Sequence, residues 1–190
     1  MKTFFTFKIA VLSSILVSFL VLPTFGLEGW RYYILSVGGD PGFIGSLANG
    51  ISLVTDLLCI SSSMGFVLLG RRVGNKLLTI SSAIIVAFGI VLVLANLVMM
   101  VVPSIYLYEN VLVSVVVLIL VGVLGILFGI GLLQGKGKIG VYATPAGILS
   151  IIVGGTFVFY FTATLGMLLA PPLMLLEVLI LDRAAQKYES

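Results

Sequence analysis

Long apolar runs, separated by short polar or glycine- and proline-rich breaks, make up most of this 190-residue chain. About 20 apolar residues are enough for a helix to cross the hydrocarbon core of a bilayer. The pattern therefore predicts an all-α, polytopic bundle of six transmembrane helices, folded as a single membrane domain over residues 1–190. The expected spans are 9–25, 44–69, 77–102, 111–133 and two further crossings within 141–181.

The stretch 141–181 is too long for one crossing. As a single helix it would run about 60 Å, twice the hydrocarbon thickness. Thr144 followed by Pro145 is typical of a helix start. We therefore expect a helical hairpin with its turn near 162–166. The alternative is one long tilted helix to Ala170, followed by a short interfacial helix.

The last crossing contains residues that are unusual in a membrane helix. Pro171 and Pro172 are expected to kink it, because proline removes a backbone donor and clashes with the preceding turn. Glu177 is expected near the membrane interface, within reach of Arg183. The backbone carbonyls that the two prolines free can line a cavity.

Positive charges determine the expected orientation. Six crossings place all ten lysines and arginines except Arg31 on one side of the membrane. This is the positive-inside pattern, with both termini in the cytoplasm and the longest connection, 28–43, on the outer face. Five crossings would leave Arg183 and Lys187 outside.

The first span has a second interpretation. Lysines followed by an apolar run, with small residues at Thr24 and Gly26, resemble a secretory signal and its cleavage site. The length of the run and the bulky Phe25 after Pro23 argue against cleavage. Cleavage would leave five spans and would not change the orientation of the rest.

Composition narrows the class of protein. The chain is 61% hydrophobic and 9% charged, whereas soluble domains carry about 25% charged residues. We expect a multi-pass protein of the cell membrane, with the lipid bilayer as its surroundings and no basic face left for nucleic acid. Histidine is absent and Cys59 is the single cysteine. No catalytic, cofactor-binding or metal-ligating residues are therefore expected, and we do not expect an enzyme.

A polar stripe interrupts the second span. Asn49, Ser52, Asp56, Cys59 and Ser63 recur every three or four residues, which places them on one helix face. Small polar side chains often hydrogen-bond to neighbouring membrane helices, so four of the five need no function. Asp56 differs, because a carboxylate near the middle of a span costs about 3 kcal/mol.

Asp56 needs a partner or a proton. No lysine or arginine is expected at its depth, so we expect no ion pair within the chain. Asn96 in the third span or Ser150 in the fifth could donate a hydrogen bond to it. Otherwise Asp56 is protonated or pairs with a cation from a partner subunit. The candidate ion or proton site consists of Asp56, Asn49, Ser52, Ser63 and Asn96.

Glycines form a second pattern. Gly122, Gly125 and Gly129 share one face of the fourth span, and Gly147 and Gly154 share a face of the fifth. Such faces let helix backbones approach closely in lipid. Packing within the chain is the favoured interpretation, and a homodimer interface is the more specific alternative.

Two functions are compatible with these features. The leading hypothesis is a noncatalytic accessory or structural subunit of a larger membrane complex, since the chain has almost no soluble mass and several small-residue faces for other helices. The alternative is a small proton- or cation-coupled transporter or channel, which we expect to be a homodimer because one chain of this size has little room for a solute pathway. There Asp56 would be the coupling acid, and Asn49, Ser52 and Ser63 would line the path.

Overall fold

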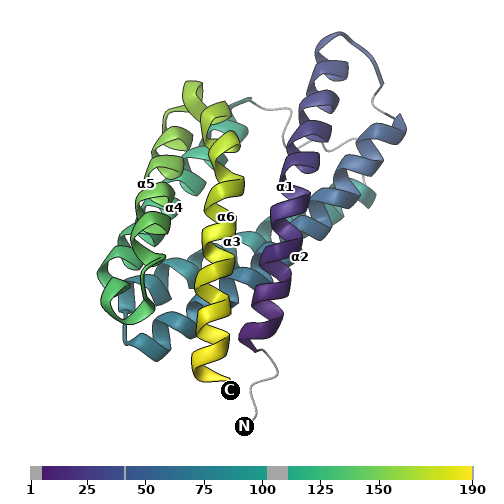
Figure 1. Ribbon diagram of the computed structural model, residues 1–190. Coiled ribbons are helices and arrows are strands. Elements are labelled where there is room, and N and C mark those ends of the chain that lie inside the picture. The colour runs from purple at the N-terminus through teal and green to yellow at the C-terminus, as the bar shows by residue number, and fades with distance from the viewer. Residues whose placement is uncertain (1–5, 41, 102–110, 190) are drawn as a thin grey trace.

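The computed structural model describes residues 6–40, 42–101 and 111–189. These residues form helices joined by short turns, so the predicted all-α fold is confirmed (Figure 1). Five helices are long and apolar enough to cross a membrane, and α5 is a shorter apolar helix of 16 residues. This fits an integral membrane protein. The elements are α1 (Phe7–Ser36), α2 (Gly42–Val73), α3 (Lys76–Val101), α4 (Val111–Ile139), α5 (Ala143–Val158), η2 (Tyr160–Thr162) and α6 (Ala163–Tyr188).

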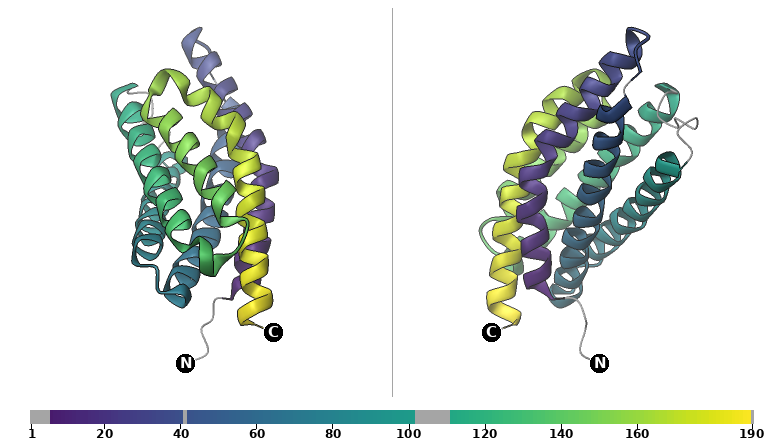
Figure 2. Two further views of the ribbon diagram at one scale, coloured as in Figure 1. Left: turned by 60° about the vertical axis from the view of Figure 1, so that its left-hand side comes forward. Right: turned by 90° about the vertical axis from the view of Figure 1, so that its right-hand side faces the viewer.

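The six α-helices form a closed ring. Each packs mainly on the helices that precede and follow it in the chain, and α6 closes the ring against α1. Both views in Figure 2 show α1 and α6 side by side. At this seam the rings of Phe7 and Tyr188 lie 6.1 Å apart, and the Phe7 backbone N–H donates to Glu189 Oε1 at 2.5 Å.

Basic residues gather at one end of the ring, which we call the basic end. It consists of the first turn of α1, the α2–α3 and α4–α5 turns, and the last turn of α6. Lys138 Nζ donates to a backbone carbonyl at the end of α2 at 2.8 Å. The Arg183 guanidinium lies 4.3 Å from the centre of the Tyr142 ring. Arg31 is near the other end of α1, and Lys2 lies outside the described residues.

The helix α1 is longer than predicted. The expected span 9–25 and the expected outer loop 28–43 were both wrong in extent, because α1 continues to Ser36 and only a short turn precedes α2. In lipid a helix that passes a proline still satisfies most of its backbone groups internally. Glu28 and Arg31 also have polar partners on α2, described below, so this stretch packs as helix instead of leaving the bundle.

The part of α1 that resembles a signal sequence is integrated in the ring. The Ser13 hydroxyl donates to Ser61 at 2.8 Å, and the Ser14 and Ser62 hydroxyls are 2.5 Å apart. These bonds tie α1 to α2 within the predicted first span. Retention of residues 1–26 stays a prediction, and the ring as described includes residues 7–26.

The predicted break within 141–181 is present, and the alternative of one long helix is wrong. The turn lies slightly before the predicted 162–166, because the Thr162 hydroxyl donates to carbonyls at the end of α5, including that of Thr156 at 2.9 Å. Gly166 lies inside α6, where a Cβ atom would come 2.9 Å from the Phe157 ring. It is a point of close helix contact and not a turn residue.

Two smaller expectations concern helix starts and prolines. The helix α5 begins at Ala143, one residue before the expected cap Thr144, and its N-cap residue Tyr142 makes no side-chain cap. The helix α6 runs unbroken through Pro171 and Pro172. The kink expected at these two prolines stays a prediction.

Candidate functional site

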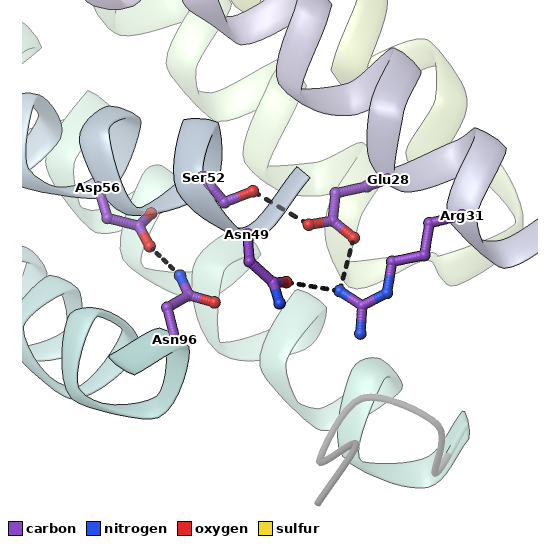
Figure 3. A network of polar contacts seen from close by, with 6 residues as sticks. All are labelled: Glu28, Arg31, Asn49, Ser52, Asp56 and Asn96. Atoms are coloured by element: carbon purple, nitrogen blue, oxygen red, sulfur yellow. Dashed lines mark hydrogen bonds and ion pairs between the residues drawn. The ribbon is translucent and has the colours of Figure 1, made fainter. Parts of the chain in front are cut away.

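The polar stripe of α2 meets three different surroundings. Near the end opposite the basic end, Asn49 and Ser52 bond to α1. One turn further, Asp56 bonds to α3. Cys59 and Ser63 line the interior of the ring. Figure 3 shows the first two of these groups, and the stripe therefore leads from a polar cluster on α1 and α2 toward the ring axis.

The polar cluster on α1 and α2 is built around Arg31. Its Nη1 donates to Asn49 Oδ1 at 2.8 Å and lies 3.5 Å from Glu28 Oε2, while Ser52 Oγ donates to Glu28 Oε1 at 3.0 Å. The Arg31 side chain is only 6% exposed. Buried charges require such partners. The sequence prediction placed both charged residues in a loop, although their i, i+3 spacing was a signal for a helical pair.

Asp56 has one of the partners expected from the sequence. Asn96 Nδ2 on α3 donates to Asp56 Oδ2 at 2.7 Å, and Asn96 is buried. The other candidate, Ser150, donates instead to the Gly125 carbonyl at 2.8 Å. The bond between Asp56 and Asn96 joins α2 to α3 across the helix interface.

A cavity of about 400 Å³ lies inside the ring, and residues of all six helices line it. Its wall is mostly apolar. Five phenylalanines contribute to it, together with small polar groups at the level of the stripe residues nearest the basic end. The phenylalanines are Phe25, Phe66, Phe88, Phe128 and Phe157, and the small polar residues are Ser14, Cys59, Ser62, Ser63 and Ser150.

A tightly packed layer closes the cavity toward the basic end. The largest apolar side chains that are less than 2% exposed all lie on this side, and the edge of Phe66 packs on Phe128 with ring centres 4.9 Å apart. No comparable layer of large buried side chains lies on the other side of the cavity among the described residues. We call this layer the floor, and we call the cavity with its floor the cup. The floor residues are Phe66, Leu69, Leu78, Leu132, Ile180 and Leu181.

Glu177 lines this cup, which the sequence did not predict, and its interfacial depth stays a prediction. It is half-buried, about three turns before the end of α6. Arg183, its expected partner, packs on Tyr142 instead. Within the described residues the Glu177 carboxylate makes no hydrogen bond or ion pair. The sequence prediction missed this because it ended the last span too early.

The glycine faces of α4 and α5 pack on each other. A Cβ atom on Gly122 would lie 2.6 Å from the Gly154 carbonyl oxygen, and one on Gly129 would lie 2.6 Å from the Gly147 carbonyl oxygen. A Cβ on Gly125 would be 3.4 Å from the Cα of Gly154. These glycines therefore face each other within the chain, and they are not free to dock another helix.

Comparisons with family models, with curated proteins and with solved structures found no match to this chain. Within the described ranges, no three acidic, cysteine or histidine side chains are grouped so that they could hold a metal ion. The cup, the residue Glu177 inside it and the polar stripe that leads to it are therefore the features on which a function can be argued.

Proposed function

We propose that this protein is a small membrane transporter whose solute site is the cup. One observation supports this proposal: six helices of one chain surround a cavity that all of them line, and among the described residues the layer of large, fully buried side chains lies toward the basic end. A chamber that opens to one side of the membrane is what an alternating-access transporter presents in one of its end states.

The hypothesis of an accessory or structural subunit stays a prediction, with less support from the geometry. It depended partly on small-residue faces available to other helices, and the glycines of α4 and α5 are occupied by each other. A homodimer also stays a prediction. The reason for it was that one chain has little room for a solute path, but a single chain here lines a cavity of about 400 Å³.

The orientation follows from charge. We propose six crossings with both termini in the cytoplasm, because the described lysines and arginines other than Arg31 gather at the basic end. The floor of the cup then faces the cytoplasm. In this orientation we assign the described conformation to the outward-facing state.

Asp56 is the proposed coupling acid. It lies one helical turn from the cavity residue Cys59, on the side away from the floor. Its ionised form accepts the hydrogen bond from Asn96, so binding of a proton changes the link between α2 and α3. Glu28 and Cys59 are the other titratable groups near it.

Cys59 tests the transporter proposal directly, because it is the single cysteine and lines the cavity. A membrane-impermeant trimethylammonium methanethiosulfonate should form a mixed disulfide with it in right-side-out and also in inside-out vesicles. The reason is that a transporter exposes its chamber to each side in turn. Modification from one side only, or from neither, contradicts the proposal. Ser36→Cys in a Cys59→Ser background reports the sidedness of the vesicles, because Ser36 is exposed at the end of α1.

The coupling role of Asp56 predicts a pH effect on this access. The ratio of the two labelling rates should change with pH in the natural sequence, since protonation of Asp56 shifts the balance between the two facing states. Intrinsic thiol reactivity cancels in the ratio. Asp56→Asn should remove the dependence, whereas Asp40→Asn, in the exposed α1–α2 turn, should keep it. If the labelling ratio of Asp56→Asn depends on pH as it does in the natural sequence, Asp56 is not the coupling acid.

A further inference from the structure

Among the described residues, Glu177 is the one acidic residue in the wall of the cup, and no described lysine or arginine lines it. A carboxylate in apolar surroundings is costly unless it is paired or protonated. The small polar residues nearby are largely satisfied within the protein, since Ser14 pairs with Ser62 and Ser150 donates to a backbone carbonyl. Among the described residues, Glu177 therefore remains the charged group of the cavity that is open to a ligand.

The rest of the wall favours an apolar partner. Phenylalanines from α1, α2, α3, α4 and α5 surround the cavity. Apolar ligand surface is stabilised by such walls, and the faces of aromatic rings attract cations. Carboxylate and rings together select one chemical class, in which a positive charge is carried on an apolar body.

We propose that the cup binds a hydrophobic organic cation, such as a quaternary ammonium or phosphonium ion, whose charge pairs with the Glu177 carboxylate. This substrate class rests on the proposed function in taking the cup as the solute site. A hydrophobic anion would be repelled by Glu177. A neutral lipid chain would fill the apolar wall but leave the carboxylate without a partner.

Binding of two probes of the same shape and opposite charge tests the proposal. The natural chain is reconstituted in nanodiscs of zwitterionic lipid, so that no net surface charge attracts one ion and repels the other. Tetraphenylphosphonium should bind at least about tenfold more tightly than tetraphenylborate, a difference of about 1.4 kcal/mol. Empty nanodiscs provide the correction for partition of each ion into lipid.

Variants on α6 assign the selectivity to one side chain. Glu177→Gln should weaken tetraphenylphosphonium binding at least about tenfold and leave tetraphenylborate binding unchanged or stronger. Glu177→Asp keeps the charge and should retain part of the affinity. Asp182→Asn removes a carboxylate from the same helix outside the cavity, where it bonds to Gln186, and should have no effect.

The outcomes separate this proposal from the proposed function. Equal binding of both ions, or equal cation binding by the natural chain and Glu177→Gln, overturns the cation site while two-sided access to Cys59 still supports a transporter. Selective cation binding that depends on Glu177, together with one-sided access to Cys59, supports the site and overturns transport. A probe that is displaced equally well by neutral lipid counts against the cation site.

Discussion

Replacing Gly154 with alanine should lower the free energy of unfolding by about 2 kcal/mol, as overpacking of a close interface does. The new Cβ would lie 2.5 Å from the Gly122 carbonyl oxygen and 2.8 Å from the Ile126 backbone nitrogen. Both are backbone atoms, so the strain is relieved only if α4 and α5 move apart. Denaturant unfolding in detergent micelles, followed by circular dichroism, measures the change.

The adjacent residue provides the control. A Cβ on Gly155 meets nothing within 4 Å, so Gly155→Ala should leave stability unchanged or raise it by up to about 1 kcal/mol through helix propensity. Equal unfolding midpoints for the two variants would mean that α4 and α5 do not pack through these glycines. A general effect of alanine on membrane insertion would change both variants equally, so it cannot explain a difference between them.

Filling the cup should protect Cys59 from modification. Ala170 is 7% exposed and lines the cavity, so the ring of Ala170→Phe enters the space that a reagent must cross. We expect the labelling rate of Cys59 from the open side to fall at least about tenfold, equivalent to about 1.4 kcal/mol. The rate is measured by mass spectrometry of the modified chain at successive times.

A second substitution on α6 separates blockage from a change in folding. Leu168 is 64% exposed on the outer surface, so Leu168→Phe adds a similar ring on the lipid side. It should leave the labelling rate unchanged, and both variants should keep the unfolding midpoint of the natural chain. If Ala170→Phe is labelled as fast as Leu168→Phe, the reagent reaches Cys59 by a path other than the cup.

Much of the helical layout was predictable because lipid imposes a simple rule on sequence. Backbone groups must be satisfied within helices, so long apolar runs mark the helices and the lysines and arginines mark one end. The contact between Asn96 and Asp56 was also within reach, because few polar groups exist at that depth. The glycine faces of α4 and α5 were recognisable by their spacing alone.

The cup was not predictable, because it depends on which faces of the helices meet. Membrane helices are apolar on the lipid side and on the protein side, so periodicity says little about which face turns inward. Glu177 was read as interfacial because the apolar run around it was taken to end nearby, whereas α6 continues to Tyr188. Glu28 and Arg31 were assigned to a loop because their charge breaks the apolar pattern, although each is paired across to α2.

The closed ring also has a consequence for the order in which the cup forms during folding. Every seam except one joins helices that follow each other in the chain, so these contacts form between neighbours as each new helix is added. The remaining seam, between α1 and α6, joins the two most distant helices. A nascent chain can therefore assemble its first five helices as an open row of neighbours that does not yet enclose a cavity. The binding chamber is created by the last docking event, when the final helix meets the first.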